Sequence, residues 1–329
     1  MKSLVKSALL FVAIGLALYA GVYGAAERLM LQTGRSNPFF KIATAPDRTL
    51  DWVILGASHA MPLDFADFNA QMQRQTQRQI INLAAPGAGP LYNRFVLEHF
   101  LRAHQTRNLL YVVDSFAFYS RTWNEERFTD AKLLRRTPLE PAIAKRLWDY
   151  ACREGVDARA VLDYVSGFSK INNKERLQRD VWEGEAQFER AYRPSSSAVK
   201  KRIEYLFPDQ ALPATRSRYL EAFSALIALA QNEGIQVVVI KMPVPPQFYR
   251  QLPDEVAFDA ALSDLLAARG VPLHDFSAQT REPGLYFDTD HLNRTGLTEF
   301  FTRDLKPILV AGGAPQSRPA PEVNQAASR

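Results

Sequence analysis

The chain has 329 residues, of which 47% are hydrophobic and 23% charged, an ordinary composition for one large or two small globular domains. Its net charge of +5 comes without a dense block of lysines and arginines, so nucleic-acid binding is not expected. The single cysteine, Cys152, excludes an internal disulfide and a cysteine-based metal site. We expect no metal ion and no cofactor.

The first segment of the chain is apolar. Lys2 and Lys6 precede an uncharged run, Ser7–Ala26, which as a helix would be about 30 Å long and could cross a bilayer. We predict that residues 1–28 are an N-terminal membrane anchor. Two alternatives stay open: a cleaved signal peptide, with small residues Gly24–Ala26 at a cleavage site, and a buried helix of a soluble body.

The rest of the chain divides by composition. Residues 29–49, with breakers Pro38 and Pro46, predict a linker. A folded domain is predicted over residues 50–310. The last residues, 311–329, are rich in Pro, Ala, Gln and Ser and predict a disordered tail.

Short apolar segments alternate with helical patterns within the predicted domain. Strands are predicted at Leu50–Leu55, Ile80–Leu83, Asn108–Val113, Ile235–Ile240 and Val271–Asp275. Helices are predicted from about Leu63, and over Tyr92–His104, Arg216–Asn232, Asp254–Ala268 and Arg294–Val310. This alternation predicts an α/β fold with parallel strands and right-handed crossovers.

The alternation stops between about residues 116 and 213. This stretch has no segment of comparable strand quality and is mostly helical in character. We predict a helical insertion at the carboxyl edge of the sheet. It could be a lid over a site, or a peripheral helical subdomain with no part in chemistry.

Two stretches far apart in the chain carry candidate chemistry. Ser58 follows the first predicted strand and Gly56, which places it at the sheet edge where α/β folds bind ligands; the plainer interpretation is a helix cap. Asp288 precedes His291 by one turn of chain, a spacing that can bring the carboxylate to the far imidazole nitrogen. Asp290 is a rival partner, and a purely structural His291 is the alternative.

Three motifs resemble blocks I, II and V of the SGNH (GDSL-like) hydrolase superfamily. They are Gly56-Ala57-Ser58-His59, the Asn82–Gly87 turn and Asp288-Thr289-Asp290-His291. The resemblance implies a three-layer, flavodoxin-like α/β fold around a five-stranded parallel sheet. The chain is most similar to membrane-anchored envelope members, such as those of alginate O-acetylation and teichoic-acid D-alanylation.

The resemblance also implies residue roles. Ser58 would be the nucleophile, His291 the general base and Asp288 the residue that orients it. The backbone N–H groups of Ser58 and Gly87 would form the oxyanion hole, which stabilises charge present only in the transition state.

The chain departs from the family pattern at two places. Ala57 stands where block I usually has aspartate, and the region after the third strand has Asp114 and Ser115 instead of the block III asparagine. An ionised Asp114 cannot donate a hydrogen bond, which puts simple hydrolysis in doubt. His59 is expected to pack against the turn and is assigned no catalytic role.

Three functions compete. The first is a serine-dependent acyl esterase or O-acyltransferase acting on an acylated envelope glycan or lipid-linked sugar, held in the bacterial inner (cytoplasmic) membrane with its body in the periplasm or outside the cell. The second is a non-catalytic partner of a membrane-bound O-acyltransferase. The third is a structural envelope protein with an α/β body.

Overall fold

A five-stranded, all-parallel sheet is the centre of the fold. The computed structural model describes residues 1–46, 48–193, 195–280 and 282–312, so the predicted tail lies outside the described residues from 313 onward. The strands are β1 (Thr49–Gly56), β2 (Ile80–Asn82), β3 (Gln105–Val112), β4 (Gln236–Lys241) and β5 (Leu273–Asp275). Their order, β2-β1-β3-β4-β5, is that of flavodoxin-like sheets. The predicted α/β class with a five-stranded parallel sheet is confirmed.

The helical elements follow in chain order. The α-helices are α1 (Lys2–Thr33), α2 (Pro38–Thr44), α3 (Phe68–Thr76), α4 (Pro90–Phe100), α5 (Ala131–Leu134), α6 (Pro141–Arg153), α7 (Arg159–Ser166), α8 (Phe168–Ile171), α9 (Ser196–Leu206), α10 (Pro213–Asn232), α11 (Pro246–Tyr249), α12 (Glu255–Ala268), α13 (Arg294–Phe300) and α14 (Lys306–Ala311). Short turns are η1 (Ser58–Asp64), η2 (Ser115–Phe118), η3 (Arg121–Trp123), η4 (Glu125–Thr129), η5 (Glu183–Gln187), η6 (Pro283–Leu285) and the π-helical turn η7 (Phe301–Leu305).

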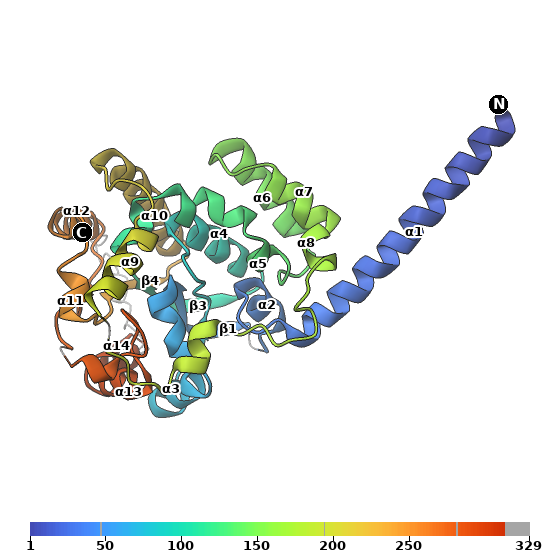
Figure 1. Ribbon diagram of the computed structural model, residues 1–329. Coiled ribbons are helices and arrows are strands. Elements are labelled where there is room, and N and C mark those ends of the chain that lie inside the picture. The colour runs from blue at the N-terminus through green and yellow to red at the C-terminus, as the bar shows by residue number, and fades with distance from the viewer. Residues whose placement is uncertain (47, 194, 281, 313–329) are drawn as a thin grey trace, which may run out of the picture.

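Helices cover both faces of the sheet, as Figure 1 shows. Successive residues of β1 point to opposite faces, so Val53 and Leu55 pack with α4, α10 and α12, whereas Trp52 and Ile54 pack with α3, α13 and α14. All four side chains are fully buried. Burial on both faces explains why the strand has a continuous apolar sequence.

The segment predicted as a linker is instead part of the folded body. α1 continues through Thr33, and α2 occupies the middle of residues 29–49. The Asn37 side chain accepts hydrogen bonds from the N–H groups of Phe39 and Phe40, and Pro38 occupies the first turn; both features favour a helix start. Phe39 and Ile42 are buried in the core, so Pro38 begins a helix here and does not interrupt one.

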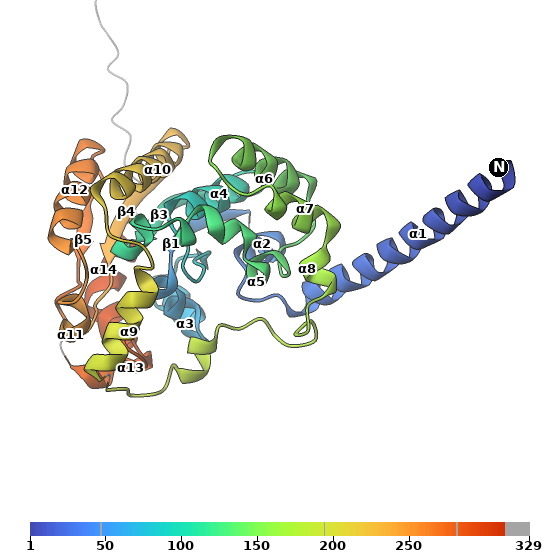
Figure 2. The same ribbon diagram turned by 45° about the horizontal axis from the view of Figure 1, so that its top comes forward.

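Local structure after β1 also differs from the prediction. The segment from Ser58 to Asp64 is a 3-10 helix, and the α-helix begins only at Phe68. The predicted closing helix is interrupted by the π-helical turn η7. Between η2 and α9 the described residues form helices and turns without a strand, and of these elements α8 lies beside the base of α1 (Figure 2).

α1 extends away from the body. It is the helix in the described chain that is long and apolar enough to cross a membrane, with a mean hydropathy of 2.0 over an 18-residue window that is wholly exposed. Length and composition support membrane association, and they do not define the compartment.

Candidate active site

Ser58 begins the turn that follows β1. Gly56 immediately before it has φ +149°, and a Cβ there would lie 2.6 Å from the carbonyl oxygen of Val112 on β3. Only glycine fits this close approach between neighbouring strands. The chain therefore turns sharply at the carboxyl edge of the sheet and starts η1 at Ser58, whose exposed fraction is 4%.

Asp288 and His291 form a compact turn. Asp288 Oδ1 accepts hydrogen bonds from the backbone N–H groups of Asp290 (3.0 Å) and His291 (2.8 Å). Both Asp288 oxygens lie 2.9 Å from His291 Nδ1. The carboxylate thus holds the imidazole by one nitrogen, and the other, Nε2, is buried without a hydrogen-bond partner in the described chain. This is the orientation that a histidine base needs.

The loop that carries His291 lies beside the turn after β1 although β5 is at the far edge of the sheet. β3 and β4 separate β1 from β5. After β5 the chain returns across the sheet edge, and the rings of His59 and His291 lie 4.7 Å apart. Ser58 is adjacent to His59 in the chain, yet no hydrogen bond joins Ser58 to His291 within the described residues.

His59 is part of a buried ionic cluster, which the sequence did not predict. Its Nδ1 lies 2.6 Å from Asp114 Oδ1, and its Nε2 lies 3.3 Å from Asp290 Oδ2. Burial favours the neutral imidazole, but Asp114 and then Asp290 stabilise the charged form and raise the pKa of His59 to about 10. His59 is therefore a buried cation beside His291, and not only a packing residue.

Asp290 is held by the insertion. Both of its oxygens contact the guanidinium of Arg202 on α9, at 2.9–3.1 Å, in the two-pronged geometry that arginine and carboxylate favour. Burial opposes its charge, but Arg202 and the two histidines hold the pKa of Asp290 well below its usual range. Asp290 Oδ1 is 3.7 Å from His291 Nδ1, farther than Asp288, so Asp288 is the closer partner of His291.

One group in the described chain has the composition of a metal site. Ligand atoms of His59, Asp290 and His291 lie within 4.8 Å of one another. The group fits a metal ion poorly, because Arg202 occupies both oxygens of Asp290 and because the adjacent carboxylates of Asp114 and Asp290 raise the pKa of His59 and favour its protonated ring. Metal ligation by histidine requires the neutral ring.

The turn after β2 brings Gly87 under the ring of Trp123. Gly87 has φ +61°, and a Cβ there would lie 2.4 Å from Trp123 Cε3. Its backbone N–H has no hydrogen-bond partner among the described residues, which leaves it available to an oxygen of a ligand. Ser115, which follows Asp114, donates instead to the carboxylate of Glu255.

The site is closed by aromatic side chains. His291 is 1% exposed. The centroid of its ring lies 5.5 Å from that of Phe287 and 5.1 Å from that of Trp182. The small cavity that His59 lines holds only about 30 Å³, about the space of one or two water molecules. A substrate can reach His291 only if one of these side chains moves.

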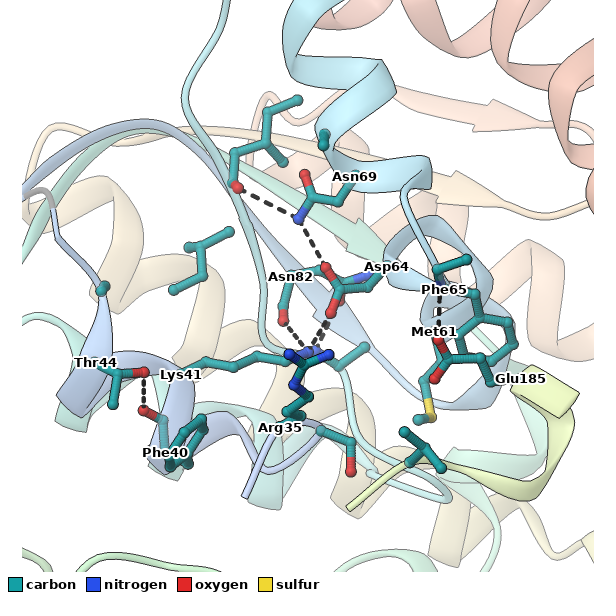
Figure 3. Close-up of a pocket in the computed structure, with 18 of the residues that line it drawn as sticks. Arg35, Phe40, Lys41, Thr44, Met61, Asp64, Phe65, Asn69, Asn82 and Glu185 are labelled. Carbon is teal, nitrogen blue, oxygen red and sulfur yellow. Dashed lines mark hydrogen bonds and ion pairs between the residues drawn. The ribbon is translucent and has the colours of Figure 1, made fainter. Parts of the chain in front are cut away.

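A larger cavity lies on the other side of η1. It encloses about 520 Å³ and is lined by residues of α2, η1, α3 and β2 and by Trp182. Figure 3 shows Lys41 reaching Asp64 (2.7 Å) and the carbonyl oxygen of Asn82 (2.8 Å) inside it. Trp182 borders both this cavity and the His291 ring, so its indole is a wall common to both.

The sequence predicted the contact between Asp288 and His291 but not the charged residues around it, and the catalytic role of Ser58 stays a prediction. His59 and Asp114 each follow a strand, β1 and β3, and these strands are neighbours. Because parallel strands end at one edge, their contact could have been predicted from the strand order. Nothing in the sequence pairs Arg202 with Asp290, because α9 belongs to the insertion.

Comparison with known proteins does not identify a family for the chain. No protein-family model matches the chain, and no curated protein matches it. Among solved structures, it is similar to one from Bacteroides fragilis named "putative acylhydrolase", with a TM-score of 0.42 and 8% sequence identity over 84% of this chain and 95% of that chain. The chemistry of the site therefore rests on its own geometry.

Proposed function

We propose that the protein is a membrane-anchored, serine-dependent acyl esterase or O-acyltransferase acting on an acylated envelope glycan or a lipid-linked sugar. The observation that carries this proposal is the Asp288–His291 contact, which leaves a buried, unpartnered Nε2 beside the turn that begins at Ser58. We place it in the bacterial inner membrane with its body outside the cytoplasm.

The proposed reaction has two steps. Ser58 Oγ attacks the acyl carbonyl while His291 Nε2 takes the hydroxyl proton, and Asp288 stabilises the resulting imidazolium. The N–H groups of Ser58 and Gly87 hold the oxyanion, and the alcohol leaves with the proton from His291. Water or a sugar hydroxyl then attacks the acyl-enzyme and gives its proton to His291, which returns a proton to Ser58 Oγ as the acid or the new ester leaves.

Retention of the N-terminal helix is supported by its contacts with the body. The hydroxyls of Tyr19 and Tyr23 donate to carbonyl oxygens of Ser166 and Tyr164. Glu27 forms an ion pair with the buried Lys170. Cleavage near Ala26 would remove both tyrosine contacts, which favours an anchor over a signal peptide.

The test is covalent labelling of the full chain by a serine-reactive phosphonate, together with release of acetate from an acetyl ester. Ser58→Ala is expected to abolish both. Ser277→Ala is the matched control, because Ser277 is also a buried serine at the carboxyl edge of the sheet, after β5, and its hydroxyl donates to Asp275. Equal labelling of the Ser58 and Ser277 variants would refute the proposal.

The second candidate is a non-catalytic partner of a membrane-bound O-acyltransferase. The closed site favours it, as does Asp114, which accepts from His59 where the family has an asparagine donor. In cells, a Ser58→Ala chain that still supports acylation of the envelope polymer would select this candidate over the enzyme.

A further inference from the structure

The turn between α7 and α8 lies directly against α1. Tyr19 Oη donates to the carbonyl oxygen of Ser166 at 2.8 Å, and Tyr23 Oη donates to that of Tyr164 at 3.1 Å. Gly167 in the turn has φ +69°, and a Cβ there would lie 2.6 Å from the Tyr23 ring. The glycine thus permits a close contact between α1 and the insertion.

Three large apolar side chains on α7 and α8, on either side of this turn, face solvent. Leu162, Val165 and Phe168, here named the α7–α8 patch, are 69%, 52% and 63% exposed. On α1, Leu18 and Val22 immediately precede Tyr19 and Tyr23, and their side chains are 67% and 52% exposed. Leu162 and Val165 lie three residues apart on α7 and so share one face of that helix, and the turn that follows contacts the apolar helix α1.

The depth of the patch follows from the helix geometry. If Ser7–Ala26 fills the hydrocarbon core, Tyr19 lies about 10 Å inside its boundary at 1.5 Å per residue. A turn that contacts Tyr19 and Tyr23 cannot then remain in bulk water. Tyr23 lies only about 5 Å inside that boundary, within the 5–10 Å or so to which an apolar face at the interface buries, and tyrosine is enriched at this interface.

We propose that the α7–α8 patch inserts into the membrane leaflet that faces the folded body. The helical insertion of the chain is then a second membrane contact of the protein, besides α1. The occupant of the patch is phospholipid. Exposed Lys174 and Arg176 follow α8, and the carbonyl of Arg176 accepts from Thr33 at the end of α1. Basic side chains at the level of Thr33, on the body side of the hydrocarbon core, favour anionic headgroups.

The test places an environment-sensitive probe on the patch of the full chain. Cys152 is exposed and is the single cysteine, so Cys152→Ser gives a clean background. Val165→Cys, labelled with a nitrobenzoxadiazole dye, is reconstituted in phosphatidylethanolamine–phosphatidylglycerol vesicles with and without lipids that carry a quencher near the headgroup. We expect emission at shorter wavelength and several-fold stronger quenching than at a control site.

The control site is Val256→Cys, 84% exposed on α12, which lies at the end of the body opposite α1 (Figure 1). Leu10→Cys, on the exposed surface of α1, reports insertion of the helix itself. Emission and quenching at residue 165 equal to those at residue 256 would overturn the proposal. A Leu10 probe that is not quenched by deeper lipid quenchers would also overturn it, because the depth of the patch depends on an inserted α1.

Discussion

His59 Nδ1 lies 2.6 Å from Asp114 Oδ1, so an ion pair joins the turn after β1 to the end of β3. Unfolded histidine has a pKa near 6.5, and the fold raises the pKa of His59 to about 10. A raised pKa means that the charged form stabilises the fold fully below pH 6.5 or so, and that this contribution is lost as pH rises toward 10.

We therefore predict that the unfolding temperature of the protein falls between pH 7 and 10 or so, and that His59→Gln removes most of this fall. The measurement is thermal unfolding monitored by circular dichroism across that range. His274→Gln is the control, because this half-buried ring on β5 stacks on Phe276. The same pH dependence in wild type and the His59 variant would contradict the assignment.

A second prediction separates Asp288 from Asp290. Asp288→Asn should lower kcat by about 10²–10⁴ with little change in KM, because the amide cannot stabilise the imidazolium of His291. Its side chain is one-third exposed, so stability should change little. Asp290→Asn should instead destabilise the fold by about 3 kcal/mol, because it leaves the charge of Arg202 without its carboxylate, and leaves His59 only Asp114 as an ionic partner. Ester hydrolysis and urea unfolding measure the two effects, and an Asp288 variant with wild-type kcat would contradict the first.

A third prediction concerns Trp182. Trp182→Ala should speed phosphonate labelling of Ser58, because it opens the wall between the 520 Å³ cavity and His291. Gly184→Ala should act in the same direction, since its Cβ would lie 2.4 Å from the indole. Trp148→Ala, which removes a 57% exposed indole from α6, is the control and should label at the wild-type rate. Slower labelling of the Trp182 variant would show that the indole helps to form the site.

A fourth prediction concerns Gly87. Gly87→Ala should destabilise the protein by about 2–4 kcal/mol, because left-handed backbone and a clash with Trp123 add together. It should also reduce kcat by displacing the proposed oxyanion donor. Gly234→Ala has a similar φ of +74° with no atom within 4 Å of the new Cβ, and should cost only about 1–2 kcal/mol. If chemical denaturation shows an equal loss of unfolding free energy for the Gly87 and Gly234 variants, the Trp123 ring moves to accommodate the new side chain.

The strands were predictable because burial on both faces demands short, continuous apolar runs such as Val237–Ile240. The Asp288–His291 contact was predictable because both residues lie on one turn of chain. Neither inference needs knowledge of distant residues.

The features that could not be predicted are those that join distant segments. α2 depends on burial of Phe39 and Ile42 against α4, which outweighs the proline-rich appearance of residues 29–49. The contacts of Trp182 with His291 and of Arg202 with Asp290 come from an insertion whose packing no periodicity reveals. The insertion contacts the His291 loop. Its sequence alone did not decide between a lid over the site and a peripheral subdomain.

The ion pair between Glu27 and Lys170 lies within a row of contacts from Tyr19 to Thr33, spread along about 20 Å of α1. A helix that contacts the folded body over that length cannot rotate freely relative to it. With α1 across a bilayer, the distance from Ser58 to the lipid surface would be fixed, so any substrate of the proposed reaction would have to reach Ser58 at that one distance from the membrane.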